Sequence, residues 1–173
     1  MIRFICSILL LIGSGLVYGQ GVIVLQDKPF VYKDNRDTAV WNQLQANSTF
    51  RSLPTMEQEF FYWSNLMRKN PASFSETVLK EFLSQFPEAN SGESRSLITD
   101  LKQVKAALPF LVPEEGLIRM AKTHAADLKN RGGIISHQSS SGKSFVDRIK
   151  EIGGDRCGAE NVVVGKPQAL DAL

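Results

Sequence analysis

The chain has 173 residues, with 20 Lys and Arg against 18 Asp and Glu, and a formal net charge of +2. This length allows one domain and little else. Because the positive charges do not gather in a basic patch, we expect no nucleic acid among its partners.

Residues 1–19 have the pattern of a secretory signal peptide. Arg3 precedes an apolar run, and small residues follow up to a cleavage point after Gly19. The run is shorter than the about 20 apolar residues that a membrane-spanning helix needs. We expect a secreted or extracellular protein, with the cell envelope as a further location, and no stable membrane span after signal cleavage. An uncleaved N-terminal anchor is the alternative.

Cleavage after Gly19 leaves one cysteine, Cys157. An exported chain with a single cysteine forms no internal disulfide, so core packing must stabilise it. Cys157 is then a buried small hydrophobe, a reactive thiol, or the partner of a cysteine beyond Leu173.

Residues 20–54 are polar after a short β-like start, and we interpret them as an extended N-terminal arm. Regular structure is expected from Thr55, where Thr55 and Gln58 match a capping box. The aromatic residues that follow have helical spacing, and this helix should end at Asn70, before Pro71.

Further apolar periodicities predict four more helices and one strand. The helices start at Ser73 (a second capping box, with Glu76), near Leu97, at about residue 113 and at Ser144, and the strand covers Val162–Val164. A last helix begins at Pro167 and has under two turns before Leu173. A helix that short is not stable alone, so we expect the chain to be a fragment.

Two residues of the C-terminal half carry candidate chemistry. His137 opens a Ser/Gly loop, and Glu160 precedes an apolar run. Imidazole and carboxylate are metal ligands and acid–base groups. On the residues alone, a polar loop residue is the favoured interpretation of His137, and a surface carboxylate is the alternative for Glu160.

Other residues near this pair have simpler interpretations. His124 lies on the apolar stripe of the helix at about residues 113–131, which predicts a hydrogen-bonded core histidine. Ser139, Ser140 and Ser141 lack the G-x-S-x-G surroundings of a serine nucleophile.

Taken together, four segments resemble the CAP superfamily of cysteine-rich secretory, antigen 5 and pathogenesis-related proteins, in its cysteine-poor bacterial SCP-like branch. They are SNLMRKNPASF, with Asn65 and Arg68; LPFLVPEEGLIRMAKTHAADLKNRG; ISHQSSSGKSFVDRI; and GAENVVVG. The resemblance implies an α+β fold, an α-β-α sandwich, over residues 55–173, of which this chain carries mostly the N-terminal helical half and the first strand. It also implies a cleft of two histidines and two glutamates that holds zinc or another divalent cation in some members.

His137 matches the first cleft histidine and Glu160 the first cleft glutamate, which makes them the expected metal ligands, with no cofactor beyond the cation. Asn161 matches the asparagine after that glutamate. The chain departs from the family in carrying Ala159 where glycine is usual, and the second glutamate and histidine would lie beyond Leu173. We expect a half site that binds metal weakly, and a chain that alone is marginally stable or aggregates.

Three functions follow as hypotheses. The first is a secreted domain with a metal-capable cleft that binds an extracellular or envelope ligand, such as a lipid. The second is a secreted metal-dependent hydrolase that uses His137 and Glu160. The third is an extracellular adhesion or interaction module with a vestigial cleft. The sequence does not decide whether the protein is an enzyme.

Overall fold

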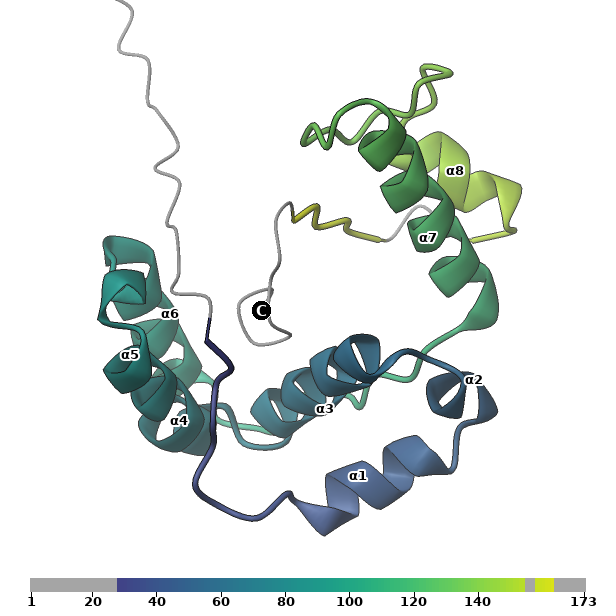
Figure 1. Ribbon diagram of the computed structural model, residues 1–173. Coiled ribbons are helices and arrows are strands. Elements are labelled where there is room, and N and C mark those ends of the chain that lie inside the picture. The colour runs from purple at the N-terminus through teal and green to yellow at the C-terminus, as the bar shows by residue number, and fades with distance from the viewer. Residues whose placement is uncertain (1–27, 155–157, 164–173) are drawn as a thin grey trace, which may run out of the picture.

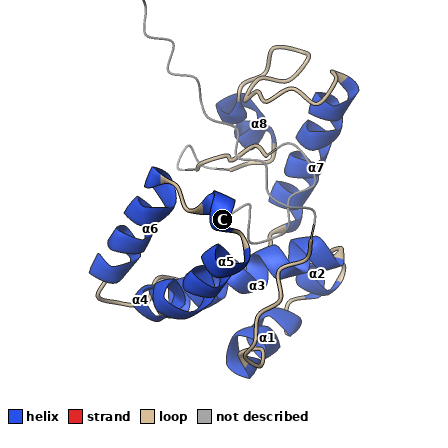
Figure 2. Cartoon of the chain, turned by 60° about the vertical axis from the view of Figure 1, so that its left-hand side comes forward, coloured by secondary structure: helices blue, strands red, loops and turns tan. Residues whose placement is uncertain are grey.

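The computed structural model describes residues 28–154 and 158–163, and helices and loops make up this part of the chain (Figures 1 and 2). The predicted signal peptide, Cys157, Val164 and the helix expected from Pro167 lie outside the described residues. The elements in chain order are α1 Thr38–Gln45, α2 Ser48–Arg51, α3 Thr55–Lys69, α4 Pro71–Phe74, the π-helix η1 Ser75–Leu79, α5 Lys80–Gln85, the 3-10 helix η2 Pro87–Ala89, α6 Gly92–Gln103, α7 Glu115–Asn130 and α8 Phe145–Glu151.

The expected α-β-α sandwich is wrong for the described part of the chain. Helices take up 60% of these residues, and none of them forms a strand. Val162 and Val163 are in irregular structure, and Val163 is 50% exposed. A strand needs a neighbour for its backbone hydrogen bonds, and no described segment supplies one.

The expected extended arm is also wrong over residues 38–51, which form α1 and α2. Each helix begins at a side-chain cap: Asp37 accepts a hydrogen bond from the backbone N–H of Val40, and Asn47 accepts one from Phe50. Val40, Leu44 and Phe50 are buried, so this segment belongs to the core.

Helix α3 spans the predicted residues, but its capping box is absent. Its N-cap is Pro54 without a side-chain bond, and the Gln58 side chain instead donates to the Leu53 carbonyl at 2.9 Å. The next helix starts at Pro71, two residues before the predicted Ser73, because Asn70 caps it by accepting from the Ser73 N–H. Proline suits this first position, since it lacks the N–H that would be left unpaired.

Two apolar clusters hold helices α1 to α6 together in what we call the N-terminal body, residues 28–107. One cluster joins α4, η1, α5 and α6, and the other joins α1, α2 and α3. Trp63 and Leu66 of α3 pack against both clusters. The completely buried Phe50 and Phe86 are among the largest side chains of the two clusters.

Helices α7 and α8, the loop between them and residues 158–163 form what we call the C-terminal region, residues 115–154 and 158–163 (Figure 1). On α7, His124 and Leu128 are buried, whereas Leu117 is 43% exposed. The first turns of α7 meet the N-terminal body through Ile118, which packs on the α1–α3 cluster, and through a 3.3 Å ion pair between Lys122 and Glu57.

The connector between α6 and α7 is fixed to α3 by polar side chains. The buried Asn65 donates to the Leu111 carbonyl at 2.9 Å and accepts from the Leu111 N–H at 2.7 Å. Arg68 donates to the Pro109 carbonyl at 2.6 Å. These two residues of the Asn-x-x-Arg segment therefore hold the connector against α3, shortly before α7 begins behind its cap Glu114.

Within the described ranges, every helix is too short or too polar to cross a lipid bilayer.

Candidate functional site

The site is built on α7, whose buried His124 fixes the chain that follows the helix. Positive-φ glycines at 132 and 133 end α7 and turn the chain back. His124 is 4% exposed, and its Nε2 lies 2.9 Å from the Ser136 carbonyl oxygen. Because a carbonyl only accepts, the ring carries its hydrogen on Nε2. His124 is thus a hydrogen-bonded core histidine, and it places Ser136 directly before His137.

The three serines of the loop form hydrogen bonds that hold the loop in place. Asp127 of α7 accepts hydrogen bonds from the Ser140 N–H at 2.8 Å and from the Ser140 hydroxyl. The Ser139 hydroxyl pairs with Ser141 at 2.9 Å and accepts from the Lys143 N–H at 3.0 Å. These contacts give the three hydroxyls structural partners, which agrees with the absence of a serine-nucleophile motif.

Arg148 of α8 is the centre of the site. Helix α8 starts at Ser144 with the reciprocal Ser144–Asp147 capping box, and this turns the Arg148 side chain, 8% exposed, toward the loop. Its Nη1 donates to the carbonyl oxygens of His137 at 3.0 Å and Lys143 at 3.1 Å. Its Nη2 donates to Oε1 of Glu160 at 2.5 Å. One guanidinium therefore joins α8, the loop and the segment that carries Glu160.

Glu160, which binds this guanidinium through one oxygen, forms a hydrogen bond to His137 through the other. His137 Nδ1 lies 3.0 Å from Glu160 Oε2, and His124 Nε2 lies 3.8 Å from the same oxygen. Burial alone raises the pKa of Glu160, but hydrogen bonds from Arg148 and His137 outweigh it and hold the pKa below its ordinary value. The carboxylate is ionised and accepts only, so Nδ1 of His137 donates.

The opposite nitrogen of His137 is the reactive feature of the site. The His137 side chain is 62% exposed, whereas Glu160 is 12% exposed. With the hydrogen on Nδ1, Nε2 carries a lone pair, and no side chain or backbone group in the described ranges bonds to it. A largely shielded carboxylate that fixes the tautomer of an exposed imidazole is the arrangement found behind metal-bound and general-base histidines.

The donors present fit part of a metal site. Imidazole nitrogen and carboxylate oxygen both suit zinc, but no group of three or more His, Cys, Asp and Glu residues in the described parts of the chain has metal-site geometry. Both oxygens of Glu160 already accept hydrogen bonds. The expected pair, His137 and Glu160, thus consists of one outward ligand atom and the carboxylate that orients it.

Gly158 lets the Glu160 segment approach α8. A Cβ at this position would lie 3.1 Å from Phe145 Cζ and 3.1 Å from Ile149 Cδ1. Glycine has no Cβ, so the backbone at this position can lie directly against α8.

Arg148 is the site residue that the sequence reasoning missed. It stands three positions after Phe145 and four before Ile152, so the three residues share one face of α8. A charged residue on an apolar helix stripe signals a buried partner, because an unpaired charge there is costly.

Comparisons with protein-family models, with curated proteins and with solved structures found no match to this chain. The resemblance to the CAP superfamily stays a prediction.

Proposed function

We propose that this protein is a ligand- or partner-binding domain that acts outside the cell, with His137 as the contact group of its site. The observation that carries the proposal is the relay from Arg148 through Glu160 to His137, which leaves Nε2 of an exposed imidazole facing outward. The extracellular location rests on the signal-peptide pattern of residues 1–19.

A divalent cation fits this role as a bridge. His137 supplies one nitrogen, and a closed zinc site needs four ligands or three with water. The remaining ligands therefore come from water and from the bound molecule, such as a lipid headgroup or another envelope component. Such a site exchanges its metal readily and binds tightly only when the ligand is present.

Zinc titration of the full chain by isothermal calorimetry tests the proposal. We expect weak binding of one Zn²⁺ per chain, lost in His137→Ala and weakened about 10–100-fold in Glu160→Gln, which leaves the imidazole without its orienting carboxylate. Gln138→Ala is the matched control, because Gln138 is the exposed neighbour in the same loop. Unchanged zinc binding by His137→Ala would refute the assignment.

A metal-dependent hydrolase is the second candidate, favoured by the same hydrogen bond. Nε2 of His137, oriented by Glu160, would hold the divalent cation, and the cation would supply a bound hydroxide as the nucleophile for hydrolysis. Metal-dependent ester hydrolysis that disappears in His137→Ala, with the fold retained, would favour the hydrolase over the binding domain. Partner binding that survives removal of both His137 and Glu160 would instead favour an interaction module.

A further inference from the structure

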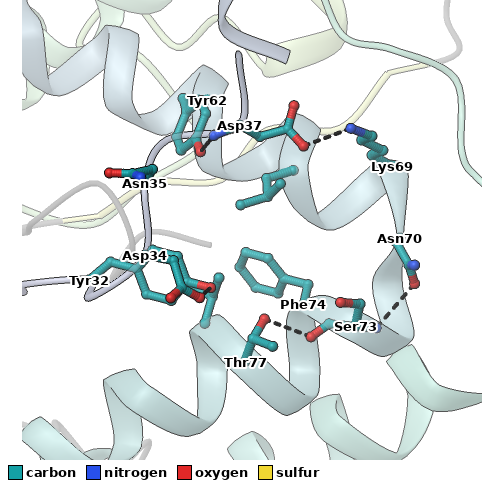
Figure 3. Close-up of a pocket in the computed structure, with 12 residues that line it drawn as sticks. Tyr32, Asp34, Asn35, Asp37, Tyr62, Lys69, Asn70, Ser73, Phe74 and Thr77 are labelled. Carbon is teal, nitrogen blue, oxygen red and sulfur yellow. Dashed lines mark hydrogen bonds and ion pairs between the residues drawn. The ribbon is translucent and has the colours of Figure 1, made fainter. Parts of the chain in front are cut away.

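A second site lies in the N-terminal body, away from His137. A cavity of about 390 Å³ opens between residues 32–37, α3, α4 and η1 (Figure 3). This volume is within the usual range of about 300–1,000 Å³ for small-molecule sites. Nothing in the His137 site draws on these residues.

The inner wall of the cavity is apolar. Leu66, Phe74 and Val78 line it, and Phe74 and Val78 are 4% and 1% exposed. The hydroxyl ends of Tyr32 and Tyr62 border the same space (Figure 3). The cavity therefore offers a short apolar body a surface to bury, with polar groups at its edge.

The charges at the rim are unevenly matched. Both carboxylate oxygens of Asp37 have partners, because one accepts from the Val40 N–H at 3.0 Å and the other from Lys69 Nζ at 2.6 Å. This pair also neutralises Lys69. Asp34 accepts from the Tyr32 hydroxyl at 3.0 Å, and no Lys or Arg in the described ranges forms an ion pair with it.

The basic side chains near Asp34 in the sequence form ion pairs with other carboxylates. Lys33 pairs with Glu81 at 3.1 Å, and Arg36 pairs with Glu59 at 2.6 Å. Two carboxylates and one ammonium line the cavity, so its net charge is negative and the uncompensated charge is at Asp34. Such a cavity attracts a cation and repels an anion.

A π-helical turn of the backbone lines the same cavity. Thr77 and Val78 line the cavity from η1, a π-helical turn between α4 and α5. The turn is accompanied by a bond from the Thr77 hydroxyl to the Ser73 carbonyl at 2.8 Å. π-helical turns are rare and frequently occur at functional sites.

We propose that this cavity binds a small organic cation, an ammonium group attached to a short apolar body. The ammonium lies against the Asp34 carboxylate and the Tyr32 ring, which favours a cation through its π face. The apolar body covers Phe74 and Leu66. The proposal is independent of the His137 site.

Three probes of the same length test it: n-pentylammonium, pentan-1-ol and pentanoate, each titrated into the full chain and followed by ¹H–¹⁵N chemical shifts. We expect n-pentylammonium to shift the amides of Asp34, Asn35 and Ser73 in a saturable way, with the alcohol weaker and pentanoate without effect. Asp34→Asn should weaken the ammonium about tenfold or more, since it removes a charged hydrogen bond but keeps the side-chain shape.

Asp100→Asn is the control, because Asp100 is an exposed carboxylate on α6 that does not line the cavity. Its titration should match that of the natural chain. Equal affinity for the three probes, no saturable shift with the ammonium, or undiminished binding by Asp34→Asn would each overturn the proposal.

Discussion

The N-terminal body and the C-terminal region are held together by different forces. Of the buried apolar residues in the described chain, all but Leu128 and Ile149 belong to the N-terminal body. The C-terminal region is instead joined by side-chain hydrogen bonds, those of Arg148 above all. The first part should therefore respond to changes in side-chain volume, and the second to changes in charge and hydrogen bonding.

The largest expected effect is in the N-terminal body. Phe86→Ala removes a completely buried ring that stacks on Phe82 at a centroid distance of 4.8 Å, and it should lower the free energy of unfolding by about 3–5 kcal/mol. Urea unfolding followed by circular dichroism measures this loss. Leu97→Ala, on the exposed side of α6, should cost far less. Equal losses for the two variants would refute the assignment of Phe86 to the core.

The matching change in the C-terminal region is Arg148→Met. It keeps an apolar stem but leaves Glu160 and two carbonyl groups without their donor, so the opening free energy of this region should fall by about 3 kcal/mol. Native-state hydrogen exchange should show faster exchange in α7 and α8 and unchanged protection in α3. Lys150→Met, at an exposed position of α8, is the control. Uniform loss of protection over the whole chain would remove the distinction between the two regions.

A smaller effect is expected where the Glu160 segment touches α8. Gly158→Ala places a methyl group 3.1 Å from Phe145 and Ile149, tight enough to cost about 1 kcal/mol in thermal unfolding. Gly92→Ala adds a methyl group with nothing within 4 Å, in the first turn of α6, and should be neutral or stabilising. Effects of the same sign and size would mean that Gly158 is not packed on α8.

The smallest expected effect is the response of the Asp127–Ser140 contact to low pH. The hydrogen bonds from Ser140 hold the pKa of Asp127 below its ordinary value of 3.8. A lowered folded-state pKa contributes stability that is present above the unfolded value and is lost as the pH falls through the folded value. The Ser140 amide resonance should therefore titrate below pH 3.8. Asp127→Asn should abolish this transition, whereas a midpoint above the ordinary value would contradict the Asp127–Ser140 contact.

The helices that sequence reasoning predicted well are those whose ends are set locally. Pro54 and the Asn70–Pro71 step bound α3, and Ser144 with Asp147 starts α8. The predicted capping boxes at Thr55 and Ser73 are wrong because other groups take the hydrogen bonds. The Gln58 side chain binds the Leu53 carbonyl after α2, and Asn70 caps α4. Local pattern does not show such tertiary partners.

The candidate site was predictable only in part. His137 and Glu160 are 23 positions apart, and spacing alone could not bring them together. Family resemblance paired them, and the structure adds Arg148, whose place on the α8 stripe was visible in the sequence. The predicted strand is wrong because Val162 and Val163 match a strand only in composition. A strand also requires a neighbouring strand, which the described part of the chain does not offer.

Glu160, fixed by Arg148, holds the hydrogen of His137 on Nδ1 and leaves Nε2 as the free ligand atom. Long-range ¹H–¹⁵N correlation of the histidine rings at a pH where the His137 ring is neutral tests it directly. We predict a protonated Nδ1 and an unprotonated Nε2 in His137, a preference that is lost in Glu160→Gln, and a zinc-induced shift at Nε2. A hydrogen on Nε2 in the natural chain, unchanged in Glu160→Gln, would show that Glu160 does not set the tautomer of His137.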